Sequence, residues 1–123
     1  MALSQIGQIA VTVKDVPRAR AFYRDTLGLK FLFDGGERLT FFDAGGVRLM
    51  LSIPEPEHDH PSSILYFKVT DIGRHVDALK SRGVTFVGEP HIIARMPTYD
   101  LWMAFFTDSE GNTLALYEEA QTK

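Results

Sequence analysis

The sequence contains no cysteine, and this absence excludes several classes of protein. A disulfide scaffold, a thiolate zinc site, an iron–sulfur cluster and a cysteine nucleophile all need that residue. Basic residues are not in surplus either, because 13 Lys and Arg stand against 16 Asp and Glu, for a net charge of −3. Nucleic-acid-binding domains are typically basic, so we expect no nucleic-acid partner.

Long apolar runs are also missing. No run approaches the ~18 residues that a helix needs to cross a bilayer, so we expect no membrane partner. The first residues, Met1-Ala-Leu-Ser-Gln5, have neither the basic start nor the apolar stretch of a secretory signal. We therefore expect a cytoplasmic protein.

The chain does have enough apolar residues for one core. Its 123 residues, 45% of them hydrophobic, fit a single domain spanning residues 1–123. A chain of this size removes somewhat under ~70% of its unfolded surface from water, so it needs no disulfide or metal to fold.

The first half of the chain has the pattern of a strand, a helix and three strands. Ile9, Val11 and Val13 alternate with other residues, as in a half-buried strand. Asp15 is placed to cap a helix that ends at Gly28. Three extended segments follow, separated by glycine-containing turns: residues 29–33, 38–42 and 47–53.

Residues 54–61 contain three prolines and three carboxylates, which is typical of a linker. The pattern then returns, with Asp71 as the cap of a second helix and Gly83 after its end. Later strands are predicted at residues 84–87 or 84–95, 99–106 and 112–117. We therefore divide the domain into module one, about residues 5–53, the linker 54–61, and module two, about residues 62–119.

The two modules repeat each other in sequence. Val13-Lys-Asp15 matches Val69-Thr-Asp71 at an offset of 56 residues. The pattern Gly-x-x-Leu-x-Leu at residues 46–51 matches residues 111–116 at an offset of 65. A repeated module is a strong architectural signal, and the change of offset predicts an insertion around residues 89–100.

The motifs resemble the glyoxalase/bleomycin-resistance/extradiol-dioxygenase superfamily, which has the vicinal oxygen chelate fold. The resemblance rests on residues 9–15, on Arg20-Ala-Phe-Tyr23 with Leu27-Gly28, and on residues 106–116. It implies an α+β fold of two paired β-α-β-β-β modules, whose curved mixed sheets form a cup-shaped pocket with the helices outside. It also implies a small molecule in the cup, a metal there in many members, and frequent assembly as a homodimer.

The resemblance further implies where metal ligands would lie, one on the first and one on the last strand of each module. The corresponding residues here are Gln8, Met50, Ile64 and Ala115. Divalent catalytic metals need several imidazole or carboxylate ligands, and only Gln8 offers even an amide oxygen. We therefore expect no metal and no other cofactor.

Strand alternation assigns further side chains to the cup, on the same sheet faces as those four positions. These are Arg48, Ser52, Tyr66, Lys68, Thr113 and Tyr117. A hairpin turn at residues 108–111 is expected to pair Trp102 with Tyr117, which would bring Asp100 and Trp102 into the cup as well.

The inserted segment carries two polar candidates, His91 and Arg95, on one parity of its predicted strand. If both face the cup, Arg95 could bind an anion by a bidentate contact. The alternative for Arg95 is a salt bridge to Asp100 or a solvated charge. The two histidines of His58-Asp-His60 have the spacing of a metal-binding motif, but they lie in the linker. A solvated loop is expected there instead of a metal site.

Three functions are compatible with these observations. The first is a metal-free protein that binds a small organic molecule with an aromatic body and one anionic or polar group, beside Trp102 and with Arg95 or His91 at the polar end. The alternative is a lyase, isomerase or dioxygenase of the same superfamily, with a divalent metal on relocated ligands or with His91 as an acid–base group. The third is a dimeric scaffold without a ligand. For all three we expect a homodimer.

Overall fold

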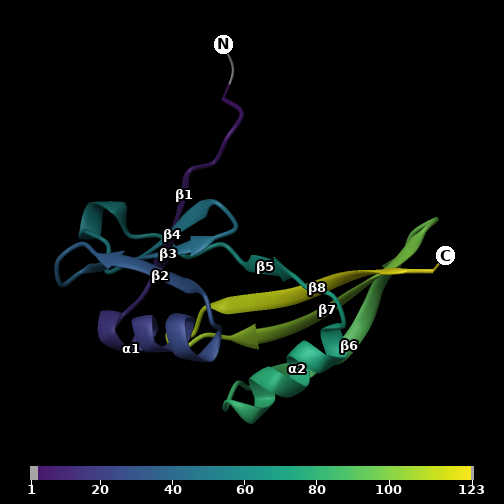
Figure 1. Cartoon of the computed structure of the whole chain (residues 1–123). Helices are drawn as coiled ribbons and strands as arrows, with labels where there is room; N and C mark the ends of the chain where they lie inside the picture. Colours follow the sequence, from purple (N-terminus) through teal and green to yellow (C-terminus); the bar gives the residue numbers. More distant parts are fainter. Residues whose placement is uncertain (1–2, 123) are drawn as a thin grey trace. The chain divides into compact units, whose positions relative to one another are not determined.

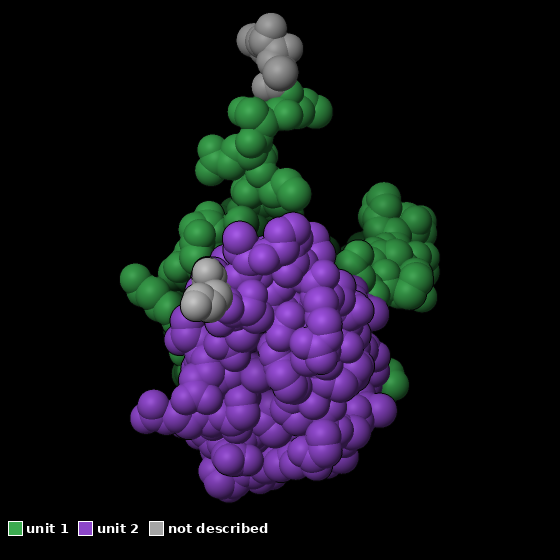
Figure 2. Space-filling view, turned by 90° about the vertical axis from the view of Figure 1, so that its right-hand side faces the viewer, with its two compact units in different colours: residues 1–63 green, residues 64–123 purple. Residues whose placement is uncertain are grey.

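The structure, a computed structural model, describes residues 3–122 (Figure 1). It consists of two compact units, Met1–Ser63 and Ile64–Lys123, which Figure 2 shows in green and purple. Each unit is a β-α-β-β-β module with a four-stranded mixed sheet, which confirms the predicted α+β class. Within residues 3–122 no helix is long and apolar enough to cross a membrane. That the two sheets together form a cup stays a prediction.

Unit 1 has its strands in the order β1-β4-β3-β2, with β1 parallel to β4 and the other pairs antiparallel. Its elements are β1 (Gln8–Thr12), α1 (Val16–Ala21), a π-helical turn (Phe22–Thr26), β2 (Lys30–Asp34), β3 (Leu39–Ala44) and β4 (Val47–Ser52). The predicted linker contains one short 3-10 helix, Pro56–His58.

Unit 2 repeats this arrangement with the order β5-β8-β7-β6, and β5 is parallel to β8. Its elements are β5 (Leu65–Lys68), α2 (Ile72–Ser81), β6 (Phe86–Arg95), β7 (Tyr99–Thr107) and β8 (Thr113–Gln121). The extra residues of this module lengthen its strands, since β6 and β7 have 10 and 9 residues where β2 and β3 have 5 and 6.

The strand registers confirm the sequence repeat. Ile9 of β1 lies beside Leu49 of β4, and Leu65 of β5 lies beside Leu114 of β8. These two pairs are related by the offsets of 56 and 65 residues that the motifs predicted. The same side-chain alternation therefore produces the same parallel strand pair in both units.

Both helices begin at the predicted aspartates. The carboxylate of Asp15 accepts a hydrogen bond from the backbone N–H of Arg18 at 3.0 Å, and that of Asp71 accepts one from Arg74 at 3.4 Å. Such caps engage N–H groups that have no partner inside the helix. The first helical segment ends before Gly28, whose φ of +80° is a conformation that glycine adopts without strain.

Each helix covers one face of its own sheet. In unit 1, α1 packs against β3 and β4, and Val11, Phe42 and Leu51 are buried there. In unit 2, α2 packs against β6, β7 and β8. Buried leucines of the strands contribute to these cores, among them Leu49 and Leu51 in unit 1 and Leu114 and Leu116 in unit 2. We call the opposite sheet surface the helix-free face of each unit.

One core position of unit 1 carries a polar group without a partner. Thr40 is fully buried, and its hydroxyl makes no hydrogen bond with any described residue. Burying an unpaired hydroxyl costs about 1–3 kcal/mol, so Thr40→Val is expected to raise the free energy of unfolding by about 1–2 kcal/mol. Urea denaturation measures this change.

The matched control is Thr12→Val, because the Thr12 hydroxyl donates a hydrogen bond to the carbonyl oxygen of His60 at 3.0 Å. Removing that bond is expected to lower the free energy of unfolding by about 0.5–1.5 kcal/mol. Equal shifts of the same sign in the two variants would contradict the account.

Candidate functional site

The helix-free face of unit 1 brings together three residues that sequence alternation assigned to one face. Gln8 lies beside Arg48 in the register of β1 and β4. The Nε–H of Arg48 donates to Oε1 of Gln8 at 2.9 Å, and Nε2 of Gln8 donates to the sulfur of Met50 at 3.5 Å. The predicted common orientation of Gln8, Arg48 and Met50 is therefore confirmed.

Two phenylalanines complete this face, and the sequence reasoning missed both. The rings of Phe33 and Phe41 lie 4.7 Å apart, centroid to centroid. The guanidinium carbon of Arg48 lies 5.8 Å from the centroid of Phe33 and 5.1 Å from that of Phe41, within the range of cation–π attraction. The two hairpins could have indicated these residues, because Phe41 lies opposite Met50 and Phe33 lies opposite Phe41.

The helix-free face of unit 2 is aromatic as well. Tyr66 of β5 lies beside Ala115 of β8, and its ring contacts that of Phe105 edge to face at 6.1 Å. Tyr117 lies opposite Met103 on the same face. Ile64, which precedes β5, is 42% exposed. Whether these residues contact a ligand stays a prediction.

The predicted pairing of β7 with β8 is wrong by one residue. Trp102 lies opposite Glu118 and not opposite Tyr117. The cause is the turn, which closes with a hydrogen bond from the backbone N–H of Asp108 to the carbonyl oxygen of Asn112 at 2.9 Å. Because a shift of one residue moves every side chain to the other face, Trp102 lies on the face that α2 covers.

The predicted common orientation of His91 and Arg95 is also wrong. His91 lies opposite Met103, whereas Arg95 lies opposite Asp100, because the register of β6 shifts between residues 92 and 94. One extra residue in a strand reverses the alternation beyond it. His91 therefore belongs to the helix-free face, and Arg95 and Asp100 share the face of Trp102. The alternative for Arg95 is confirmed, since its Nη1 lies 3.2 Å from Oδ2 of Asp100.

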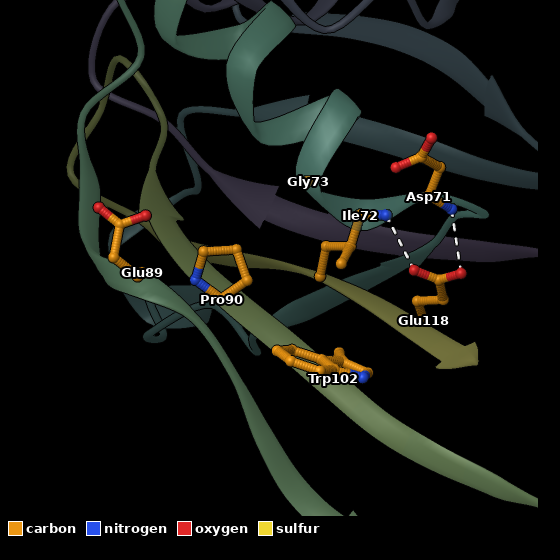
Figure 3. Close-up of a pocket in the computed structure, with 7 residues that line it drawn as sticks. All are labelled: Asp71, Ile72, Gly73, Glu89, Pro90, Trp102 and Glu118. Atoms are coloured by element: carbon orange, nitrogen blue, oxygen red, sulfur yellow. Dashed lines mark hydrogen bonds between the residues drawn. The ribbon is translucent and has the colours of Figure 1, made fainter. Parts of the chain in front are cut away.

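Trp102 borders a hollow of about 420 Å³ at the start of α2 (Figure 3). The hollow is lined by Asp71, Ile72, Gly73, Glu89, Pro90, Trp102 and Glu118. The Glu118 carboxylate points at the first turn of α2 and accepts hydrogen bonds from the backbone N–H groups of Asp71 at 3.0 Å and Ile72 at 2.9 Å. These N–H groups would otherwise attract an anion, and the protein's own carboxylate already engages them.

We expect Glu118→Gln to weaken this end of α2. An amide oxygen is a weaker acceptor than a carboxylate, and it does not complement the positive helix N-terminus, so the free energy of unfolding should fall by about 1–2 kcal/mol. Trp102, the only tryptophan, gives a fluorescence signal for urea unfolding close to the altered contact. The exposed Glu37 provides the control Glu37→Gln, which is expected to change stability by less than about 0.5 kcal/mol. An equal loss in both variants would contradict this role of Glu118.

The four positions that the resemblance assigns to metal ligands do not fit a divalent metal. Oε1 of Gln8, the only amide oxygen among them, already accepts a hydrogen bond from the cationic side chain of Arg48. Met50 offers a thioether, and Ile64 and Ala115 offer only hydrocarbon. Divalent catalytic metals take imidazole and carboxylate ligands, and a neighbouring positive charge opposes their binding.

Residues elsewhere in the described part of the chain do not form a metal site either. His58, Asp59 and His60 are exposed beside the short 3-10 helix, and Nδ1 of His60 lies 3.1 Å from the carbonyl oxygen of Pro61. Across residues 3–122, no group of three or more His, Cys, Asp or Glu side chains is placed to hold a metal ion.

Comparisons with known proteins agree with this architecture. A family model described as the Glyoxalase/Bleomycin resistance protein/Dioxygenase superfamily matches residues 5–116. The uncharacterized protein YetH of Bacillus subtilis (strain 168) is 25% identical over 126 residues, which cover 94% of this chain and 99% of that protein.

Two solved structures are similar over nearly their whole length. A member of the same superfamily from Sphaerobacter thermophilus DSM 20745 matches with a TM-score of 0.78 and 25% identity, covering 95% of this chain and 98% of that one. TnmS3, an antibiotic binding protein from Streptomyces sp. CB03234, matches with a TM-score of 0.76 and 26% identity, covering 98% and 99%.

Proposed function

This chain belongs to the glyoxalase/bleomycin resistance protein/dioxygenase superfamily, and from that premise we propose that it binds a small organic molecule without a metal. The observation that carries the proposal is the helix-free face of unit 1. There the rings of Phe33 and Phe41 and the thioether of Met50 lie beside the polar groups of Gln8 and Arg48. Small-molecule sites typically combine apolar walls with a few fixed polar groups.

Two further observations support binding over metal-dependent chemistry. The similar protein TnmS3 is an antibiotic binding protein, so this fold serves ligand binding in a protein 26% identical to this chain. The residues at the implied metal positions are also poor metal ligands, as described above. On the helix-free face of unit 2, Tyr66 and Tyr117 are proposed to contact a ligand, whereas Ala115, also assigned to the cup, is fully buried beneath this face.

The enzymatic alternative that relies on His91 has weaker support. His91 is exposed, and its Nδ1 lies 3.1 Å from the carbonyl oxygen of Glu89. Catalytic acid–base groups are usually buried or placed beside a charged neighbour. The side chain of His91 is exposed to solvent instead. We therefore place binding ahead of catalysis.

We also propose that the protein forms a homodimer in the cytoplasm. Each sheet ends in two edge strands, β1 and β2 in unit 1 and β5 and β6 in unit 2, and edge strands are commonly covered by a partner. Light scattering is expected to give the mass of two chains at micromolar concentration. A single-chain mass across that range would contradict the dimer.

The binding proposal is tested by a ligand-observed NMR screen of compact aromatic compounds, charged and neutral, in the presence of EDTA. We expect hits that persist in EDTA and that weaken several-fold in Phe33→Ala, because Phe33 is 46% exposed on the proposed surface. Met96→Ala is the matched control, since Met96 is also an exposed apolar residue, at 43%, and lies in the turn between β6 and β7, away from the helix-free faces.

Two outcomes would contradict the proposal. One is the absence of hits at millimolar compound concentrations. The other is a set of hits that EDTA abolishes and that added Zn²⁺ or Ni²⁺ restores, because such behaviour requires a protein-bound metal.

A further inference from the structure

We infer that Arg48 binds the oxyanion group of the ligand, and that the ligand is therefore a compact organic acid with an apolar or aromatic body. This inference rests on the proposed function and names its ligand class. It depends on four observations on the helix-free face of unit 1: how Arg48 is fixed, which of its nitrogens remain free, what surrounds them, and where it lies in the fold.

Arg48 is fixed on two sides. Its Nε–H donates to Oε1 of Gln8 at 2.9 Å, and its guanidinium lies over the neighbouring rings of Phe33 and Phe41. Gln8 is in turn fixed by its contact with the sulfur of Met50 at 3.5 Å. A guanidinium held in this way loses little further conformational freedom when it binds an anion.

The two Nη groups at the outer edge of this guanidinium have no hydrogen-bond or ion-pair partner among residues 3–122. Gln8 engages Nε only, and within residues 3–122 no carboxylate forms a salt bridge with Arg48. The nearest acid in the strand register is Asp43, directly opposite on β3, and its Oδ1 accepts a hydrogen bond from the backbone N–H of Gly46 at 3.3 Å. The two Nη groups are therefore free to bind the two oxygens of a carboxylate.

The surroundings favour an anion that carries an apolar group. The ring of Phe33, 46% exposed, lies beside the guanidinium and can pack against the body of a ligand whose carboxylate binds Arg48. An organic cation would be repelled by Arg48, and a neutral compound would use only the apolar surface. The site thus selects by charge at one end and by shape at the other.

Arg48 lies beside two of the four positions that the resemblance assigns to metal ligands, Gln8 and Met50. Gln8 accepts a hydrogen bond from Arg48, and Met50 accepts one from Gln8. In this chain a guanidinium therefore provides positive charge at that place, and an oxyanion can bind there without a metal.

Arg95, which the sequence offered together with His91 for the polar end of the ligand, differs from Arg48 in its sheet face and in its ion-pair partner. Arg95 lies on the sheet face of unit 2 that α2 covers, whereas Arg48 lies on a helix-free face. The Nη1 of Arg95 forms a salt bridge with Asp100 at 3.2 Å. Arg95→Gln is therefore the matched control for Arg48→Gln. Each variant removes one arginine that lies near the end of a β-strand.

The test compares benzoate with its neutral isostere benzamide by isothermal titration calorimetry in EDTA. A charge-assisted bidentate contact is expected to make benzoate bind about 10-fold more tightly than benzamide. Arg48→Gln should remove this preference and leave benzamide affinity within about 2-fold. Arg48→Lys should keep only part of it, because an ammonium neither matches the carboxylate fork nor stacks on the rings. Arg95→Gln should retain the full preference.

The outcomes separate this inference from the proposed function. Equal affinity for benzoate and benzamide, or a benzoate preference that survives Arg48→Gln, overturns the role of Arg48 and leaves binding by the family fold in place. A preference lost in Arg95→Gln instead assigns the anion to that residue and overturns the inference. If neither probe binds the wild-type protein at millimolar concentration, both proposals fail for compounds of this class.

Discussion

Replacing Phe42 by alanine is expected to lower the free energy of unfolding by about 3–5 kcal/mol. Phe42 is fully buried on the α1 side of the sheet, and its ring contacts those of Tyr23 at 6.1 Å and Phe31 at 5.7 Å. Alanine leaves a cavity that the surrounding rings fill only in part. Small domains are stable by about 5–15 kcal/mol, so the loss should be visible as a large shift of the urea midpoint.

The control is Phe33→Ala on the opposite face of the same sheet. Phe33 is 46% exposed, and its removal is expected to cost less than about 1 kcal/mol of stability. The same variant should weaken ligand binding, whereas the folded fraction of Phe42→Ala should bind normally. A larger loss of stability in Phe33→Ala than in Phe42→Ala would show that the two faces have been assigned the wrong way round.

Replacing Asp108 by alanine is expected to lower the free energy of unfolding by about 2–4 kcal/mol. Asp108 is 6% exposed in the turn between β7 and β8. Its Oδ1 accepts hydrogen bonds from the backbone N–H groups of Glu110 and Asn112, both at 2.8 Å, and its Oδ2 accepts one from Nδ2 of Asn112 at 2.9 Å. Alanine would leave these donors without their acceptor, and buried unpaired donors are costly.

The sequence repeat supplies a matched control for this variant. Asp43 is related to Asp108 by the offset of 65 residues and occupies the corresponding turn between β3 and β4. It accepts one longer hydrogen bond, from the backbone N–H of Gly46 at 3.3 Å, and it is only partly buried. Asp43→Ala is expected to cost less than about 1 kcal/mol in the same urea experiment. Similar losses in both turns would contradict the assigned role of the Asp108 carboxylate.

Some of the residues around Arg48 could be predicted from the sequence pattern and others could not. Alternation along β1 and β4 is local, so it correctly placed Gln8, Arg48 and Met50 on one face. The partners Phe33 and Phe41 come from two other strands, and their contact depends on which residues lie opposite each other. Contacts of that kind require the strand registers, which hydrophobic periodicity does not provide.

The sequence by itself determined the order of the elements, the caps at Asp15 and Asp71, and the duplication of the module. Each of these follows from interactions between near neighbours in the chain or from a repeat of the same pattern. Only the tertiary structure decided which face Trp102 and Arg95 occupy. The turn closed by Asp108 shifts one register by a single residue, and an extra residue in β6 shifts another. In a strand with a period of two, a single-residue shift exchanges the covered face for the helix-free one, and no local pattern records it.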